Sequence, residues 1–471
     1  MSVRSLLTPT KLEDRGLQPL AGARITSTYG FDAGQPDLDL PRNRDDMALS
    51  DCTPYKVADM MTHVDDLPPV HRPGGYYAAP VPVIIPGSLK PLPPLLLASP
   101  MNMLYFHHFL AHTSKVLVTS DCPENPFRIT LAQMAVRDSS VLRLMLAFAA
   151  CHRARLLGHA EPLARIATWV GGLVPSIHRA ADSTEAISDE ALIAVVMLCS
   201  LSVLFPGVFP EHSSWQDHLV VARRMVKLRG GPGALCATKA TFFIRRWFLY
   251  LHTWGSISGC ADPEARADWF SESTATLQNP EFDCLFGFTN HSHALLWQVA
   301  DLVSRTGFGV ASGRIEWSRP GAIAAAAELR DELVHARHAP RTKACRHLTI
   351  GATAIAAIDA ALRHGALIHL LRRVFMLASE DGAVQAGVRG VVGAVRQLAS
   401  LGPVDTPDVL FSLFVAGAEA QGEAMRLEVL GYLESIEQAG MKQAGVVRTL
   451  LQRCWERRRD WVGVAEGVFL G

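Results

Sequence analysis

The stretch that decides the fold is an uncharged apolar run at residues 192–205, which reads LIAVVMLCSLSVLF. Ser188 lies just before it and is followed by two acidic residues, a pattern typical of a helix N-cap with carboxylates in the positively polarised first turn. Because the run is apolar on every side, it predicts a helix that other helices surround. Pro206 and Gly207 are expected to end it.

A second helix is predicted to begin at Trp215. Apolar residues recur after it at helical spacing, and charged residues fall mainly on the other side. Gly230 and Gly231 provide the left-handed backbone that stops a helix, and a proline follows them. Together the two helices predict a buried helical hairpin at the centre of a soluble domain.

The composition of the chain excludes several classes of protein. Its 45 lysines and arginines balance 45 aspartates and glutamates, so no overall charge attracts nucleic acid or anionic lipid. The nine cysteines are scattered singly, which excludes a Cys-x-x-Cys zinc knuckle and is untypical of a secreted disulfide scaffold. The N-terminal residues contain no apolar core of signal-peptide length. An intracellular location is therefore expected.

One segment has nearly the length of a membrane span. Residues 191–209 carry no charge, and a bilayer needs about 20 apolar residues. Two serines, a proline and a glycine interrupt the segment, and no other comparable segment exists. A buried core helix is the favoured interpretation, and no contact with a membrane is expected.

The first 100 residues differ from the rest of the chain. They hold 15 of the 28 prolines, a density that breaks helices and central strands, so residues 1–100 are predicted to form a largely disordered arm. Its apolar clusters at residues 81–85 and 95–97 are the parts expected to pack onto the domain. Residues 101–471 show helical periodicity and little or no strand-like alternation. The predicted fold is all-α, a large multi-helix bundle with antiparallel helical hairpins.

Local signals place further helices in this domain. Asn125 followed by Pro126 is typical of an N-cap with proline in the first turn, and Asp138 can cap the next helix. An aromatic-rich helix at residues 242–254 is expected to end at Gly255. Further helices are predicted at residues 322–334, 355–377 and 384–398.

The motifs that could carry chemistry are incomplete. His108 and His112 have the i, i+4 spacing of a metal pair, but no motif glutamate and no third ligand accompanies them. The glycine-rich segment 307–313 imitates a dinucleotide-binding loop, yet a predicted helix precedes it where a strand is needed. No kinase, protease or hydrolase signature is present. The chain is therefore predicted to be no enzyme and to bind no metal and no cofactor.

Several motifs, in order along the chain, resemble the fungal-specific transcription factor domain, the helical regulatory part of binuclear zinc-cluster regulators. They include Asn-Pro-Phe-Arg at residues 125–128, Phe-Ala-Ala-Cys-His at 148–152, and a Trp-x-x-His-Leu helix that ends in Arg-Gly-Gly at 229–231. The similarity covers about residues 104–461. The residues that carry it are Asn125, Pro126, Phe127, Trp215, His218, Leu219, Arg229, Gly230, Gly231, Phe414, Gly417, Glu419, Arg426 and Trp455.

The resemblance implies a transcription regulator in a fungal nucleus, specific for one pathway, for example in secondary metabolism. It also implies two closely spaced cysteine triads that read DNA, but Cys52 and Cys122 are the only cysteines before residue 150. Either this DNA-reading module was lost or it lies upstream of the start. The expected partners are other transcription regulators or a second copy of the chain in a homodimer, with DNA reached only indirectly.

A small-molecule effector is a further expectation from the resemblance, and helical bundles often leave apolar cavities between their helices. Trp247, Tyr250, Trp254 and Trp297 are predicted to line such a cavity, with plain core packing as the alternative role for each. Two other classes stay open, a helical scaffold without a role in transcription and an enzyme built in a helical cavity. Neither an acidic metal-binding motif nor a nucleophile–histidine pair supports the enzyme.

Replacement of Trp215 by alanine is expected to lower the free energy of unfolding by roughly 3–5 kcal/mol, because loss of a large buried aromatic side chain leaves a cavity. Chemical denaturation followed by circular dichroism measures the difference. An unchanged unfolding midpoint would show that Trp215 lies outside the core.

Overall fold

The computed structural model describes residues 25–31, 81–182, 186–207, 214–259, 285–287, 289–306, 319–335, 351–404, 407–457, 461 and 468–470. Within these residues the protein is helical apart from one short pair of strands, which confirms the predicted all-α fold. A single cluster of buried apolar side chains forms the core. The antiparallel course of neighbouring helices stays a prediction.

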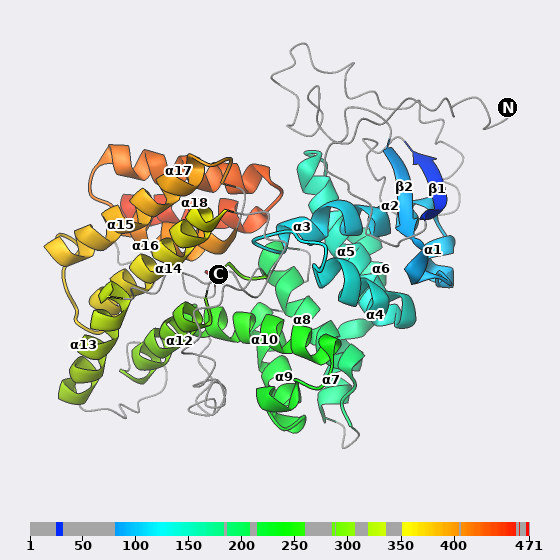
Figure 1. The fold of residues 1–471 in the computed structure, drawn as a ribbon, viewed down its shortest axis with the longest axis horizontal. Helices are drawn as coiled ribbons and strands as arrows, with labels where there is room; N and C mark the ends of the chain where they lie inside the picture. The colour runs from blue at the N-terminus through cyan, green and yellow to red at the C-terminus, as the bar shows by residue number, and fades with distance from the viewer. Residues whose placement is uncertain are drawn as a thin grey trace, which may run out of the picture.

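The helices form two groups with α10 (Lys239–Ile257) between them (Figure 1). The first group is coloured from blue to green and contains α1 (Pro94–Leu97), α2 (Pro100–His108), the π-helix η8 (Phe109–Thr113), α3 (Ser114–Val116), the π-helix η9 (Phe127–Leu131), α4 (Ala132–Arg137), α5 (Ser139–Leu156), α6 (Leu163–Val170), α7 (Leu173–Asp182), α8 (Asp189–Leu204) and α9 (Trp215–Leu228). The second group contains α12 (Asn290–Arg305), α13 (Arg319–His335), α14 (Ala352–Arg373), α15 (Gly382–Ala399), the short helix η13 (Pro407–Val409), α16 (Leu410–Ala418), α17 (Glu423–Gln438) and α18 (Lys442–Arg457).

The predicted N-terminal arm is described in part. β1 (Ile25–Phe31) and β2 (Val81–Pro86) form an antiparallel two-stranded sheet beside the first group of helices (Figure 1). The two apolar clusters of the arm contribute to the core, since Ile85 and Leu96 are both fully buried. The rest of the arm, at residues 1–24 and 32–80, lies outside the described residues.

The central apolar run forms α8, as predicted. Ser188 caps the helix, because its side chain accepts a hydrogen bond from the Ala191 backbone N–H at 3.1 Å. All ten residues from 192 to 201 are buried, which agrees with a helix that other helices surround. α9 packs against α8 and begins behind Ser214, which forms a reciprocal capping box with Asp217.

The prediction that Gly255 ends the aromatic helix is wrong, because α10 continues to Ile257. Gly255 lies where α10 approaches α9. A Cβ atom at this position would come within 2.3 Å of Leu219 Cδ2 and 3.3 Å of the Trp215 ring. The glycine is therefore explained by close helix packing. The chain turns out of the helix only at Gly259, whose φ is +91°.

α14 is the centre of the second group, where it packs against α12, α13, α15 and α16. Among the described helices it is the one long and apolar enough to span a membrane, so the expectation that no segment is comparable to residues 191–209 is wrong. However, 78% of its apolar window is buried inside the protein, as in the core helix of a globular domain. Residues 191–204 of the segment weighed above as a membrane span lie in α8, which is a core helix as well.

Candidate functional site

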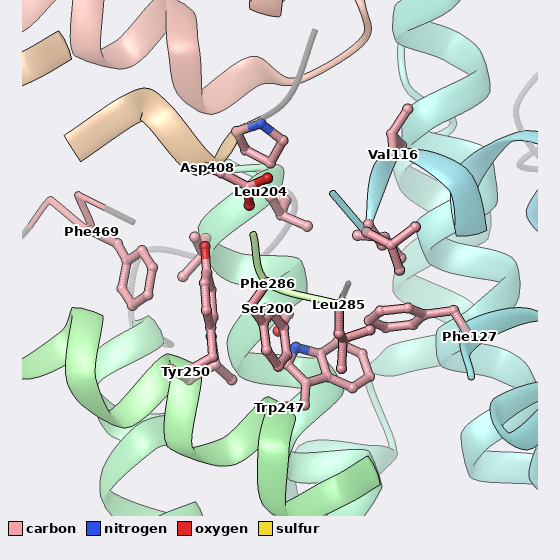
Figure 2. A pocket seen from close by; sticks show the side chains of 15 residues that line it. Val116, Phe127, Ser200, Leu204, Trp247, Tyr250, Leu285, Phe286, Asp408 and Phe469 are labelled. Atoms are coloured by element: carbon pink, nitrogen blue, oxygen red, sulfur yellow. The ribbon is translucent and has the colours of Figure 1, made fainter. Parts of the chain in front are cut away.

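A small cavity of about 50 Å³ lies between α3, α8, α10 and η13 (Figure 2). Aromatic rings make up much of its wall, and the segment at residues 285–286 closes one side. The rings belong to Phe127, Trp247, Tyr250, Phe286 and Phe469. A water molecule needs about 10–15 Å³, so the cavity has room for a few waters and not for a metabolite.

Three polar side chains reach this otherwise apolar cavity. Ser200 of α8 is 3% exposed, and its Oγ has no hydrogen-bond partner within the described part of the chain. The buried Asp408 carboxylate accepts a hydrogen bond from Thr119 Oγ1. Burial and, second, the nearby Asp408 carboxylate raise the pKa of Tyr250, so its phenol stays neutral. A bound molecule would therefore find an unused hydroxyl, a carboxylate and a phenol.

The cavity wall depends on the backbone of Gly287. Its φ is +74°, and an added Cβ would lie 2.5 Å from Thr119 Oγ1 and 2.8 Å from Asp408 Oδ2. Glycine thus lets this segment lie directly against the hydrogen bond between Thr119 and Asp408. The neighbouring Phe286 stacks on Tyr250, with ring centroids 4.5 Å apart.

The four residues predicted to line a cavity separate into two pairs. Trp247 and Tyr250 contribute to the wall of the cavity in Figure 2. Trp254 is buried in the core, where its ring packs 5.0 Å from that of Phe411. Trp297 lies on α12, is partly buried against the core and does not reach the cavity. These last two pack in or against the core, and a ligand-lining role for any of the four residues stays a prediction.

The entry motif closes the loop between α3 and η9. The Asn125 side chain donates to the Ser114 carbonyl at 2.9 Å and accepts from the Phe127 backbone N–H at 3.0 Å. The helical backbone begins directly after Pro126, within a residue of the prediction. Phe127 then inserts its ring edge-on against Phe243 and Trp247, at 5.1 and 4.7 Å.

The Arg-Gly-Gly motif joins the end of α9 to the start of α8. Arg229 donates to the Ile187 carbonyl at 2.7 Å and forms an ion pair of 2.9 Å with Asp189. Gly230 and Gly231 have φ values of +91° and +85°, the left-handed geometry predicted for a helix stop. Earlier in α9, His218 and Leu219 are fully buried. This motif fixes the position of one helix relative to the other.

The C-terminal motif residues hold the second group of helices together. Glu419 is 3% exposed, and its Oε1 accepts hydrogen bonds from Arg372 Nε at 2.7 Å and Trp461 Nε1 at 3.1 Å. Trp461 also packs against the buried Phe414, with centroids 5.5 Å apart. A buried carboxylate is stable only when it is paired in this way, so these partners depend on each other.

The remaining motif residues fix α16 against α17 and α18. The Gly417 carbonyl accepts a hydrogen bond from Trp455 Nε1 at 3.0 Å. A Cβ on Gly417 would lie 2.8 Å from the Leu451 side chain, so glycine is needed for this close packing. The Arg426 guanidinium lies 5.1 Å from the centre of the Trp455 ring and donates to the Ala420 carbonyl.

A comparison with known protein families agrees with the resemblance that these motif residues carry. The profile of the fungal specific transcription factor domain matches residues 104–466. The chain belongs to this family. No curated protein and no solved structure matches the chain.

Membership of the fungal transcription factor family makes the chain a transcription regulator, as the sequence resemblance implied. Among the family-motif residues, Phe127 is the one that lines the cavity. Most of the others are linked to neighbouring segments by caps, ion pairs and ring contacts. The motifs therefore specify the fold of the regulatory domain. Of the three polar residues of the cavity, Tyr250 was predicted from the sequence, whereas Ser200 and Asp408 were missed. Ser200 carried a weak signal as a serine within an apolar run, and Asp408 carried none.

The paired histidines of α2 and η8 belong to a buried cluster. The rings of His108 and His112 stack with centroids 5.0 Å apart, and His108 Nε2 lies 3.2 Å from His152 Nδ1. His152 Nε2 faces the Ala439 carbonyl at 3.3 Å, and a carbonyl can only accept, so this nitrogen carries the proton. The neutral Nδ1 can then accept from His108 and from Thr113 Oγ1, which is 3.1 Å away.

This cluster is not arranged as a metal site. Within the described residues, no three or more histidine, cysteine or acidic side chains are placed to hold a metal ion. That the purified protein contains no stoichiometric zinc stays a prediction. Instead, His152 joins the two groups of helices, because a Cβ on Gly440, in the turn between α17 and α18, would touch its ring at 2.8 Å.

Stability is expected to fall as the pH drops below about 6.5. Burial lowers the pKa of His152, His218 and His293 to about 4 and that of His112 and His369 to about 3. The unfolded chain, with histidines near pKa 6.5, takes up these protons first. The stabilisation is thus complete above pH 6.5 and is lost towards pH 4, by about 1.4 kcal/mol per pH unit for each histidine.

Urea unfolding at pH 7.5, 6.5 and 5.5 measures this slope. His152→Asn should reduce the slope, whereas His335→Asn, at an exposed position of α13, should leave it unchanged. Equal stability of the parent protein at pH 7.5 and 5.5 would contradict the burial of these histidines in neutral form.

Proposed function

We propose that this chain is a pathway-specific transcription regulator of the fungal nucleus that reaches DNA through a protein partner. The observation that carries the proposal is the combination of a regulatory domain at residues 104–466 with a lack of clustered cysteines anywhere in the 471 residues. A zinc cluster needs closely spaced cysteines, and here the smallest spacing is 24 residues, between Cys236 and Cys260 and again between Cys260 and Cys284.

The charge of the chain supports the same proposal. Its 45 basic and 45 acidic residues cancel, whereas a typical DNA site requires neutralisation of roughly six to ten phosphates. Partners of the expected kind are a second copy of the chain or another regulator that carries the DNA-binding module. The pathway, with secondary metabolism as one example, follows from the regulated genes and not from any residue described here.

The purified chain is expected to give no sequence-selective, salt-sensitive shift of candidate promoter DNA. Chromatin immunoprecipitation should nevertheless find it at the same promoters, because its partner carries it there. A selective shift by the isolated chain would end the proposal of partner-dependent binding. A transcript that continues upstream into two cysteine triads would replace it with an ordinary zinc-cluster regulator.

The cavity supports a second part of the proposal, that the regulator responds to a small-molecule effector. Its wall combines aromatic rings with the buried Asp408 carboxylate and with Ser200 Oγ, which has no partner among the residues that the structure describes, a pattern typical of ligand sites. Because the free volume is only about 50 Å³, an effector larger than a few atoms has to enlarge the cavity when it binds.

A metabolite screen by thermal shift is expected to find compounds that raise the melting temperature of the parent protein, by several degrees at about 100 times the dissociation constant. Ser200→Val should weaken this effect at least tenfold, because it removes the hydroxyl and fills the cavity. Ser202→Val is the matched control, since Ser202 is on the same helix, bonds to the Leu198 carbonyl and does not line the cavity. Equal shifts in both variants would place the ligand elsewhere.

A further inference from the structure

The C-terminal segment at residues 468–470 lies inside the protein. Phe469 and Leu470 are 3% and 1% exposed. The Leu470 backbone N–H donates to Ser258 Oγ at 2.8 Å, and Gln443 Nε2 donates to the Phe469 carbonyl at 2.8 Å. The ring of Phe469 meets that of Trp215 edge-on, with centroids 5.1 Å apart.

The same segment closes the effector cavity. Phe469 is part of the cavity wall, and it enters the view in Figure 2 from the side opposite Phe127. Tyr250 and Asp408 line the same space. The match to the family ends at residue 466, before this segment.

The segment lacks the helical backbone hydrogen bonds that support the α8 and α10 parts of the wall. Residues 468–470 belong to neither a helix nor a strand, whereas Ser200 and Trp247 lie within α8 and α10. The two hydrogen bonds given above link the backbone of the segment to side chains. A ligand could therefore displace this part of the wall without unfolding a helix.

We propose that Phe469 is an intramolecular plug, and that the effector binds by taking the place of its ring. This inference rests on the proposed response to an effector. The ligand class follows from the space that the plug occupies, an apolar aromatic ring, with one polar group placed to bond Ser200 Oγ. Removal of a buried phenyl ring adds a space on the order of the 150 Å³ that holds benzene in other proteins. The cavity seen here is then the closed state.

Two variants of the full-length chain test the plug, with toluene as the probe. Phe469→Ala removes the ring and should bind toluene at least about tenfold more tightly than the parent protein, because the competing group is gone. Ser258→Ala keeps the ring but removes the hydrogen bond to Leu470. It should bind toluene about fivefold more tightly, since the loss of one neutral hydrogen bond raises the population of the open state.

Ser256→Ala is the matched control, because Ser256 lies in the last turn of α10, just before Ser258, but contacts Arg223 and the His252 carbonyl instead of the segment. It should bind toluene like the parent protein. Affinities come from isothermal titration and, independently, from the rise in melting temperature with toluene concentration.

Unchanged affinity in Ser258→Ala would show that the segment is fixed core packing, and it would overturn the plug even if Phe469→Ala binds the probe or fails to fold. Tighter binding by Ser258→Ala supports the plug. This readout is independent of the proposed function, because toluene binding requires no response of any gene. If the toluene measurements support the plug but no compound changes transcription, the proposed response to an effector is wrong. The displacement of the Phe469 ring by a ligand would still hold.

Discussion

The burial of α8 on all sides is the constraint on which the rest of the structure depends. Ten consecutive residues, 192–201, are removed from water, and only neighbouring helices can cover every side of such a helix. α5, α9 and α10 pack against it directly. Arg229 fixes α9 through Asp189 at the start of α8, and Gly255 allows α10 to approach α9 closely. The position of the cavity follows, since one wall is this same helix.

Complete burial of the core also requires that its polar side chains find hydrogen-bond partners inside the protein. Many histidines lie in the interior, and the network around His152 is satisfied only while the ring is neutral. Glu419 needs both Arg372 and Trp461 to remain an ion in the core. Ser200 differs from these groups, because its Oγ is buried without a partner in the described residues. Ser412 Oγ and Trp254 Nε1 are also buried without a partner in the described residues, but Ser200 is the one of the three that lines the cavity, where a ligand or a water can satisfy it.

The sequence predicted those parts of the fold that local chemistry decides. Ser188 and Asp138 cap helices as expected, because a cap depends on a few adjacent residues. Gly255 was misread as a helix end, since the same residue type serves close packing, and only the position of Leu219 opposite decides between the two. For the same reason the cavity was predicted in part. Trp247 and Tyr250 are recognisable as aromatic residues of one helix, whereas Asp408 and Phe469 reach the site from far along the chain.

The buried C-terminal segment has a practical consequence for work with this protein. Leu470 is 1% exposed, so an affinity tag or fluorescent protein joined after Gly471 would leave the chain one residue beyond a buried side chain. Such a fusion would be joined two residues after Phe469, whose ring packs edge-on against Trp215 in the core.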